Sequence, residues 1–337
     1  MKTQGSKDMI MRHAGIILLI CVLLLGTALG QQKYAQTGAQ FLSVASDARG
    51  GGLAEAMTSI EMNGASLFFN PAGMARMKNR VDLMASQNQW IADITHNSFS
   101  FAISPEAGRW GVIGASLMSV DYGDIQGTMV WANNQGFLDT EILKPTAFAA
   151  GIGYANALSD KFAVGGQIKY VGLNYGKSVY PDEDGLPDTV RTNLAYANAF
   201  DFGTIYRTGW KSLAFGMSVR NFSDEIKFEE EGFQLPLTFA LGISMDLFDL
   251  ISEEDTQDLL ISIDALHYRS HPEQIKVGIE YKPLEMLALR GGYYSSTSEQ
   301  DMTFGIGIQQ FGLGIDYAYT PFGVWNEVHR LTARFSL

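Results

Sequence analysis

The chain has 337 residues, a formal net charge of −12 at pH 7, and 46% hydrophobic against 18% charged residues. The acidic balance argues against a nucleic-acid partner, because neutralising phosphates requires a basic face. After residue 30 no run of about 18 apolar residues occurs, which excludes a helical membrane protein.

Residues 1–30 have the pattern of a signal peptide, with a basic start, an apolar run over residues 14–25 and small residues before Gly30. The run is shorter than the roughly 20 apolar residues of a spanning helix, so we expect cleavage near Gly30 and not a helical anchor. Ile20 stands before Cys21, where a lipoprotein signal would place a small residue. Cleavage would remove the one cysteine, which excludes disulfides, thiolate metal sites and a cysteine nucleophile in the mature chain.

Residues 31–78 do not alternate like strands and are rich in alanine and glycine. Helical periodicity appears over Leu53 to Met62. Asn70 can cap a short helix that begins at Pro71, because an asparagine oxygen accepts the first free amides and proline suits a first turn. We therefore predict small helices packed tightly as an N-terminal plug.

From residue 79 to residue 337 apolar residues alternate with polar or small ones, in segments separated by turn-forming residues. The clearest segment is 274–282, where Ile275, Val277 and Ile279 share one face. We count about fourteen segments, an even number as in bacterial barrels. The prediction is an all-β membrane protein, an antiparallel transmembrane β-barrel. Its strands are expected to begin near Arg80, Ile94, Trp110, Ile142, Lys161, Asn193, Lys211, Gln234, Asp258, Gln274, Glu285, Gln300, Gly312 and Val328.

The lengths of the connections support the barrel. Connections after even-numbered strands are mostly tight, whereas the long ones, 122–141, 176–192 and 223–233, follow odd-numbered strands. Bacterial barrels sort short periplasmic turns and long outer loops in this way. The connection 249–257 is a long exception.

Several charged residues fall on the predicted inner face. A charge on the lipid face would cost about 2 to 4 kcal/mol for Arg or Lys near the midplane, so their positions agree with the assignment of faces. We expect them mainly to line the lumen, with fixation of the plug as the alternative. They are Lys169, Arg220, Lys276, Arg290, Arg330, Arg334, Asp264, Glu280 and Asp316.

The plug segment also carries a recognisable motif, made of the runs Phe41-Leu42, Asp47-Ala48-Arg49, Gly52-Leu53-Ala54-Glu55-Ala56 and Ala65-Ser66-Leu67-Phe68-Phe69-Asn70-Pro71-Ala72-Gly73. It resembles the amino-terminal signature of the PorV/PorQ family of outer-membrane proteins. Its asparagine-proline-alanine element is shared with FadL-type fatty-acid channels. The motif residues that carry the resemblance are Arg49, Gly52, Asn70, Pro71, Ala72 and Gly73. Beyond about residue 80 the resemblance is one of barrel architecture only.

The resemblance implies a FadL-like barrel in the cell outer membrane, surrounded by its lipid and closed by an internal plug. Members of the family include accessory proteins of the type IX secretion system, which hold cargo by its carboxy-terminal signal. It therefore implies a role in protein secretion, with the translocon or cargo signal domains as partners. The alternative that stays open is a channel for uptake of a hydrophobic ligand, which predicts a lateral or plug-side opening.

The connection from Tyr122 to Glu141 is the expected partner-binding outer loop. It carries Trp131 and Phe137, which are apolar anchors that a purely solvated loop would not need.

A second outer loop contains a calcium-like pattern. The run from Asp182 to Asp188 resembles the acidic core of calcium-binding extracellular repeats, with Asp182, Asp184 and Asp188 as candidate metal ligands. Only part of a ligand set is present, so a solvated acidic loop stays the alternative. No other cofactor is expected.

No catalytic constellation is found in the sequence. After residue 30 the histidines are His96, His267, His271 and His329, and no Gly-x-Ser-x-Gly element occurs. His267 and His271 have a spacing that suits zinc on a helix, but they fall at a strand end and a loop. We therefore predict that the chain is not an enzyme.

Overall fold

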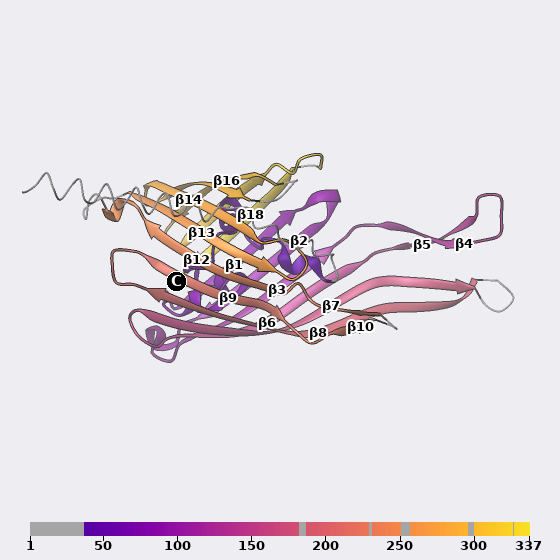
Figure 1. The fold of residues 1–337 in the computed structure, drawn as a ribbon, viewed down its shortest axis with the longest axis horizontal. Helices are drawn as coiled ribbons and strands as arrows, with labels where there is room; N and C mark the ends of the chain where they lie inside the picture. The colour runs from indigo at the N-terminus through magenta and orange to yellow at the C-terminus, as the bar shows by residue number, and fades with distance from the viewer. Residues whose placement is uncertain (1–36, 182–186, 229–230, 251–256, 296–299, 326) are drawn as a thin grey trace, which may run out of the picture. The chain divides into compact units, whose positions relative to one another are not determined.

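The computed structural model describes residues 37–181, 187–228, 231–250, 257–295, 300–325 and 327–337. The predicted signal peptide lies outside them. Fourteen antiparallel strands close into a barrel in which the first strand pairs with the last (Figure 1). The barrel strands are β1 (Val81–Gln89), β2 (Thr95–Ile103), β3 (Val112–Asp121), β6 (Thr146–Ala157), β7 (Phe162–Pro181), β8 (Pro187–Arg207), β9 (Ala214–Phe222), β12 (Thr238–Asp246), β13 (Asp258–Tyr268), β14 (Gln274–Leu284), β15 (Leu287–Tyr294), β16 (Met302–Gln310), β17 (Leu313–Thr320) and β18 (Val328–Ser336).

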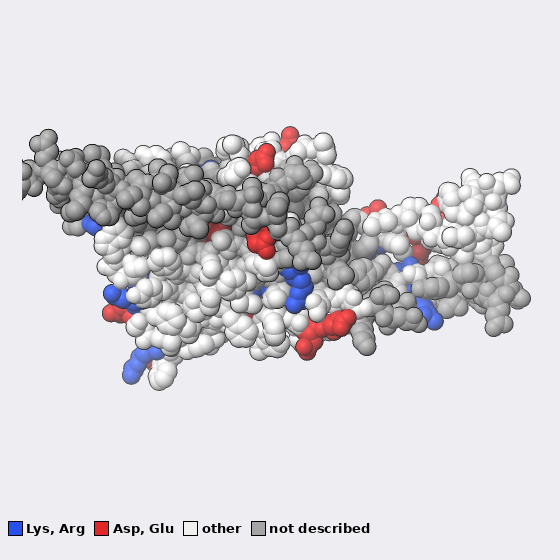
Figure 2. Space-filling model, in the orientation of Figure 1, with Lys and Arg blue, Asp and Glu red and all other residues white. Residues whose placement is uncertain are grey.

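Each wall strand presents one face to the lumen and one to the outside. Burial alternates along the whole of β3, where Ile113 and Leu117 point out while Gly114 and Ser116 point in. The wall in Figure 2 is accordingly almost free of charge, with Lys, Arg, Asp and Glu mostly toward its two ends. Among the described residues, no helix has the length and hydropathy needed to cross a membrane.

The short turns lie at one end of the barrel, together with the beginning of the first strand, β1, and the end of the last strand, β18. The amides of Arg80 and Val81 donate to the carbonyl of Leu337 at this end. The turn between β16 and β17 consists of Phe311 and Gly312, both with positive φ, as a two-residue hairpin turn of this hand requires. Because periplasmic turns are the short ones in bacterial barrels, we assign this end to the periplasm.

The opposite, outer end contains paired strands where the sequence predicted loops. Within 122–141 lie β4 (Ile125–Val130) and the start of β5 (Phe137–Leu143), which form a hairpin, and within 223–233 lie β10 (Ile226–Phe228) and β11 (Glu231–Phe233). Strands β7 and β8 themselves continue to Pro181 and from Pro187. In Figure 1 the β4–β5 hairpin and the β7–β8 pair project together beyond the barrel.

Residues 37–78 lie inside the barrel as short helical turns: η1 (Gln40–Ser43), α2 (Ala48–Gly52), η2 (Asn63–Phe68) and η3 (Pro71–Met74). The helix predicted over Leu53 to Met62 is wrong. Ala54 and Glu55 both have positive φ, which ends α2 and turns the chain across the lumen. The helix η3 begins at Pro71 behind its Asn70 cap, as predicted.

The plug runs through the lumen from the outer end to the periplasmic end. Thr37 forms a bridge with Gln234, which comes just before the outer end of β12. Phe41 and Leu42 then belong to an apolar cluster with residues from the outer halves of β3 and β7. At the other end, Ser104 donates to the carbonyl of Met77. The lumen is therefore filled along its length.

Candidate functional site

Asn70 joins the plug to the wall. Its Oδ1 accepts the amide of Ala72 at 3.1 Å, and its Nδ2 donates to the carbonyls of Thr58, at 2.7 Å, and of Thr204 on β8, at 3.1 Å. The side chain is 1% exposed. One amide thus caps η3, ties two plug segments together and attaches both to the barrel.

Glycines in the wall let this turn approach the strands. A Cβ on Gly165 would lie 2.5 Å from backbone atoms of Pro71 and Ala72, and one on Gly203 would overlap Asn70 Oδ1. Within the plug, a Cβ on Gly73 would lie 2.5 Å from Ser66 Oγ. The motif residues Asn70, Pro71 and Ala72 therefore pack against the wall at positions on β7 and β8 that are occupied by glycine.

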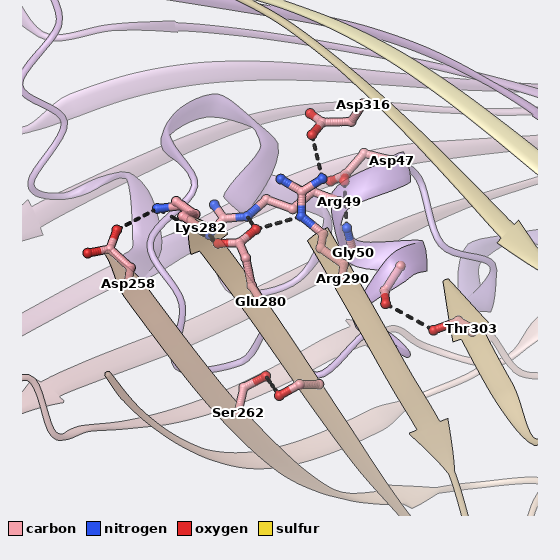
Figure 3. A network of polar contacts seen from close by, with 12 residues as sticks. Asp47, Arg49, Gly50, Asp258, Ser262, Glu280, Lys282, Arg290, Thr303 and Asp316 are labelled. Atoms are coloured by element: carbon pink, nitrogen blue, oxygen red, sulfur yellow. Dashed lines mark hydrogen bonds and ion pairs between the residues drawn. The ribbon is translucent and has the colours of Figure 1, made fainter. Parts of the chain in front are cut away.

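Arg49 forms the second attachment, shown in Figure 3. Its Nε and Nη2 donate to the two carboxylate oxygens of Glu280 on β14 at 2.9 and 2.7 Å. Arg290 Nε also donates to Glu280, at 2.5 Å, and its Nη1 donates to Asp316 at 2.6 Å. A bidentate Arg–carboxylate pair fixes orientation as well as distance, so the short helix α2 has one rotational setting against the wall.

Gly52, at the end of the same helix, touches the wall directly. A Cβ there would lie 3.1 Å from Gly305 Cα on β16. Beside it, Arg334 reaches Asp47 at 3.2 Å, and the amide of Ala48 donates to Thr332. All six motif residues thus lie at or beside contacts between the plug and the barrel.

Most of the charged residues on the inner face contact the plug. The sequence analysis expected them mainly to line the lumen and gave fixation of the plug as the alternative. Lys276 pairs with Glu55 at 2.7 Å, Asp264 accepts the amide of Thr58 at 2.9 Å, and Arg220 donates to the carbonyl of Phe68. The acidic plug residues Asp47 and Glu55 were part of the sequence motif, but the sequence analysis gave them no role as charge partners of the wall. Their position inside a glycine- and alanine-rich segment, opposite a surplus of inward cations, was the available signal.

Burial and pairing act in opposite directions on the plug's charges. Burial alone would raise the pKa of the Glu55 carboxyl, but the Lys276 ammonium and its hydrogen bond outweigh burial, so the pKa lies below its ordinary value. Burial likewise would lower the pKa of Arg49, yet Glu280 raises it. Both pairs are therefore ionised at neutral pH.

The expected partner-binding loop is placed at the tip and flank of the β4–β5 hairpin. Trp131 follows β4 and its amide donates to the carbonyl of Gly136, while Phe137 begins β5 and is 43% exposed. Leu143 at the base of the hairpin lies beside Gly176 on β7, where a Cβ added to the glycine would come within 3.3 Å of the leucine side chain. Trp131 and Phe137 are thus brought to one hairpin, far from the plug contacts.

The candidate calcium ligands stay a prediction. Asp182 and Asp184 lie outside the described residues, and of Asp188 only the backbone, at the start of β8, is described. No cluster of three or more His, Cys, Asp or Glu side chains suited to a metal occurs in the described part of the chain. Titration of calcium into the protein and into an Asp182→Ala/Asp184→Ala variant tests the prediction, and identical heats would contradict it.

Among the described residues, cavities adjoin the plug at two places. One, of about 150 Å³, lies near the periplasmic end and is lined mainly by polar groups, among them Arg49, Glu280 and Arg334. The other, of about 20 Å³, lies between Leu42, Phe68 and Lys169, and has room for roughly one water molecule. Neither has the size and apolar lining of a typical small-molecule pocket.

Comparison with known proteins adds three findings, on the family, on curated sequences and on solved structures. The model of the family described as type IX secretion system protein PorV matches residues 27–265. No curated protein sequence matches significantly.

Several solved outer-membrane transporters have a similar fold. The toluene transporter TbuX of Ralstonia pickettii is 12% identical with a TM-score of 0.57, over 85% of this chain and 98% of that one. The toluene transporter TodX of Pseudomonas putida is 13% identical with a TM-score of 0.55, over 90% and 98%. The monoaromatic hydrocarbon channel CymD is 10% identical with a TM-score of 0.59, over 87% and 98%. At these identities the likeness concerns the fold.

Proposed function

We propose a partner-binding role in secretion for this chain, which belongs to the PorV family of type IX secretion system proteins. The family match and the closed barrel confirm the predicted family, fold and outer-membrane location. The finer proposal is that the protein is a non-enzymatic accessory component, whose outer hairpin β4–β5 engages cargo or a translocon subunit while the plug keeps the lumen closed.

The exposed apolar surface of the β4–β5 hairpin supports this proposal. Val130 is 89% exposed, Ile142 56% and Ile125 48%, and Phe137 and Leu138 are also exposed. The hairpin that carries these side chains projects beyond the barrel (Figure 1). These apolar side chains lie on both faces of the hairpin, since Val130 is opposite Phe137 while Leu138 is opposite Met129. Their exposure to water is unfavourable unless a partner buries them, and aromatic side chains are favoured in the centre of such interfaces.

The experiment replaces apolar side chains of the hairpin and follows secretion. A Val130→Ser/Phe137→Ser/Leu138→Ser variant removes most of the apolar surface without touching the barrel wall. We expect type IX cargo to remain associated with the cell instead of being released, with the barrel still inserted in the outer membrane. Heat-modifiable migration on gels checks that the variant is folded.

A matched control changes polar positions of the same hairpin. Asn134→Ser/Gln135→Ser alters the tip, where both side chains are exposed, and should leave cargo release unchanged. Normal release by the Val130→Ser/Phe137→Ser/Leu138→Ser variant would contradict the proposed role of the hairpin.

Passage of a hydrophobic solute is the second candidate function, favoured by the fold shared with hydrocarbon transporters. It would need a path past the plug, yet of the described cavities beside the plug one is mainly polar and of about 150 Å³, and the other is of only about 20 Å³. Uptake of a labelled fatty acid by cells with and without the gene separates the two functions. Equal uptake would discard the channel.

A further inference from the structure

The barrel wall has a step between β8 and β9 at its outer end. The last pair that joins these two strands is Phe200 with Phe222. Strand β8 nevertheless continues outward to Pro187, paired on its other side with β7. Over residues 192–199, no strand among the described residues forms a ladder with the second edge of β8. Strand β10 lies close to β8, where Ile226 packs against the inward Ala195 and Ala199, but β10 pairs only with β11.

A bulge in β9 ends the pairing. Phe200 pairs with Phe222 but Phe202 pairs with Val219, so β9 carries one extra residue there. Asn221 within this bulge has a φ of 60°, and its amide donates to Asp201 Oδ1 at 2.7 Å. Among residues with a side chain, asparagine and aspartate adopt the left-handed backbone conformation most readily. The conformation turns β9 away from β8.

A buried lysine fixes this turning point. Lys169 Nζ lies 2.8 Å from Asp201 Oδ2 and donates to Asn221 Oδ1 at 2.5 Å. Asp201 is 1% exposed and Asn221 2%. These three buried polar side chains bind one another inside the wall. Such a network fixes the backbone at the step, so the pairing of β8 with β9 ends at a defined position.

A cavity of about 480 Å³ lies at the step, which we call the β8 notch. Its lining includes Tyr196 and Asn198 from the outward face of β8, and Ala197 and Ile226 from the inward side. A cavity lined by both faces of one strand lies along the edge of that strand, here between β8 and the residues at the start of β10.

The strand edge and the acidic and aromatic side chains of the β8 notch indicate which kind of ligand it can bind. A strand edge offers N–H and C=O groups at regular spacing, which an extended peptide satisfies by adding a strand. Asp224 and Glu225 are the charged residues that line the notch, and Figure 2 shows acidic atoms beside the start of β10. Tyr170 and Tyr196 stack next to them with ring centres 5.6 Å apart, a surface that attracts cations. The acids repel phosphate-bearing lipid.

We propose that the β8 notch is a strand-addition site for an extended, basic segment of a partner protein. The partner's main chain pairs with the edge of β8 at residues 192–199, and its Lys or Arg side chains meet Asp224, Glu225 and the tyrosine pair. This site adds a contact that does not use the β4–β5 hairpin, so it goes beyond the proposed function.

The test uses the full chain in detergent and labelled synthetic peptides. The probe is a capped peptide about eight residues long that alternates valine with lysine. A second peptide has the same sequence with every other main-chain amide methylated, and a third has glutamate in place of lysine. We expect methylation to weaken binding roughly tenfold or more, because it removes the pairing donors, and the glutamate peptide to bind poorly.

Protein variants then locate the site. Asp224→Lys/Glu225→Lys should weaken binding of the lysine peptide roughly fivefold to tenfold and strengthen binding of the glutamate peptide. Asp301→Lys/Glu327→Lys makes the same charge change elsewhere on the outer surface and should change nothing.

Equal binding of the methylated and unmethylated peptides would overturn strand addition. Co-purified lipid held at the notch, without peptide binding, would assign the notch to lipid and also overturn it. Loss of cargo release in the β4–β5 variant together with absent peptide binding would refute the notch alone. Peptide binding with normal release in that variant would refute the hairpin role alone.

Discussion

At the scale of residues, the attachment of the plug depends on buried polar groups that each satisfy several partners. Asn70 is the clearest, because its one amide serves Ala72, Thr58 and Thr204. Replacing it with alanine leaves buried carbonyls without donors, at a cost of about 1 to 3 kcal/mol. We predict that Asn70→Ala lowers the urea midpoint of unfolding in detergent, and that Asn70→Asp, which also lacks the donor, does not restore it.

The matched control for this prediction is Asn97→Ala. Asn97 bonds Gln87 at an exposed position on the wall, so its loss should leave the midpoint unchanged. An Asn70→Ala variant as stable as the native chain would show that the turn is held without the amide.

The Glu55–Lys276 pair makes attachment of the plug depend on pH. The pKa of Glu55 in the folded chain lies below its unfolded value, which is about 4.3. The contribution of the pair is therefore fully present above that pH and is lost as the pH falls through the folded pKa. We predict a melting temperature that drops in acid. Glu55→Gln should be less stable by roughly 3 to 5 kcal/mol at neutral pH, because Lys276 stays buried without its carboxylate.

Melting curves at a series of pH values check this prediction, and the Glu55→Gln curve should be flatter in acid. Parallel curves for the two proteins would assign the acid sensitivity to other carboxylates.

At the scale of elements, the wall strands are shaped to the plug. Gly165 and Gly166 are neighbours on β7, but a Cβ on Gly165 would meet Pro71 and Ala72 at 2.5 Å, whereas one on Gly166 would find its nearest atom at 3.5 Å. We predict that Gly165→Ala impairs folding or expels the plug, while Gly166→Ala is tolerated. Yield of folded barrel and protease resistance of residues 37–78 measure both. Equal behaviour of the two variants would contradict close packing at η3.

The wall strands could be predicted from the sequence, and the outer strands could not. Lipid on one side and a polar lumen on the other impose alternation, so most of the fourteen predicted starts fall within a few residues of the observed ones. The start near Ile142 belongs instead to β5, and β6 begins at Thr146. Strand β5 is exposed on both faces over most of its length, so nothing selects apolar residues at every second position.

The contacts of the plug show a similar division. The motif residues could be recognised and Asn70 could be given its capping role, because the partner Ala72 is two residues away. The pairing of Arg49 with Glu280 joins residues 231 apart in the sequence. Such a contact depends on the register of the closed barrel, which a single sequence does not specify.

At the scale of the whole molecule, the direction of the plug fixes where the chain enters the barrel. Thr37 lies at the outer end and Lys78 just before β1 at the periplasmic end. We predict that Gln40→Cys, at an exposed position of η1, reacts in intact cells with a maleimide on a polymer too large to cross the outer membrane. Lys78→Cys should react only after cell breakage. Labelling of only Lys78→Cys would reverse the assigned orientation, and labelling of both cysteines would contradict the placement of the two residues at opposite ends of the barrel.

The seam between β1 and β18 has a consequence for biogenesis. Asp82 on β1 accepts a hydrogen bond from the amide of Gly64, and Arg334 on β18 pairs with Asp47. Both strands of the seam therefore bind the plug, which is synthesised before either of them. If the barrel closed without the plug, the charged side chains of Arg290, Arg330 and Glu280 would surround an unfilled lumen. We therefore expect the plug residues to bind the curved, still open sheet before β1 and β18 pair to close the barrel.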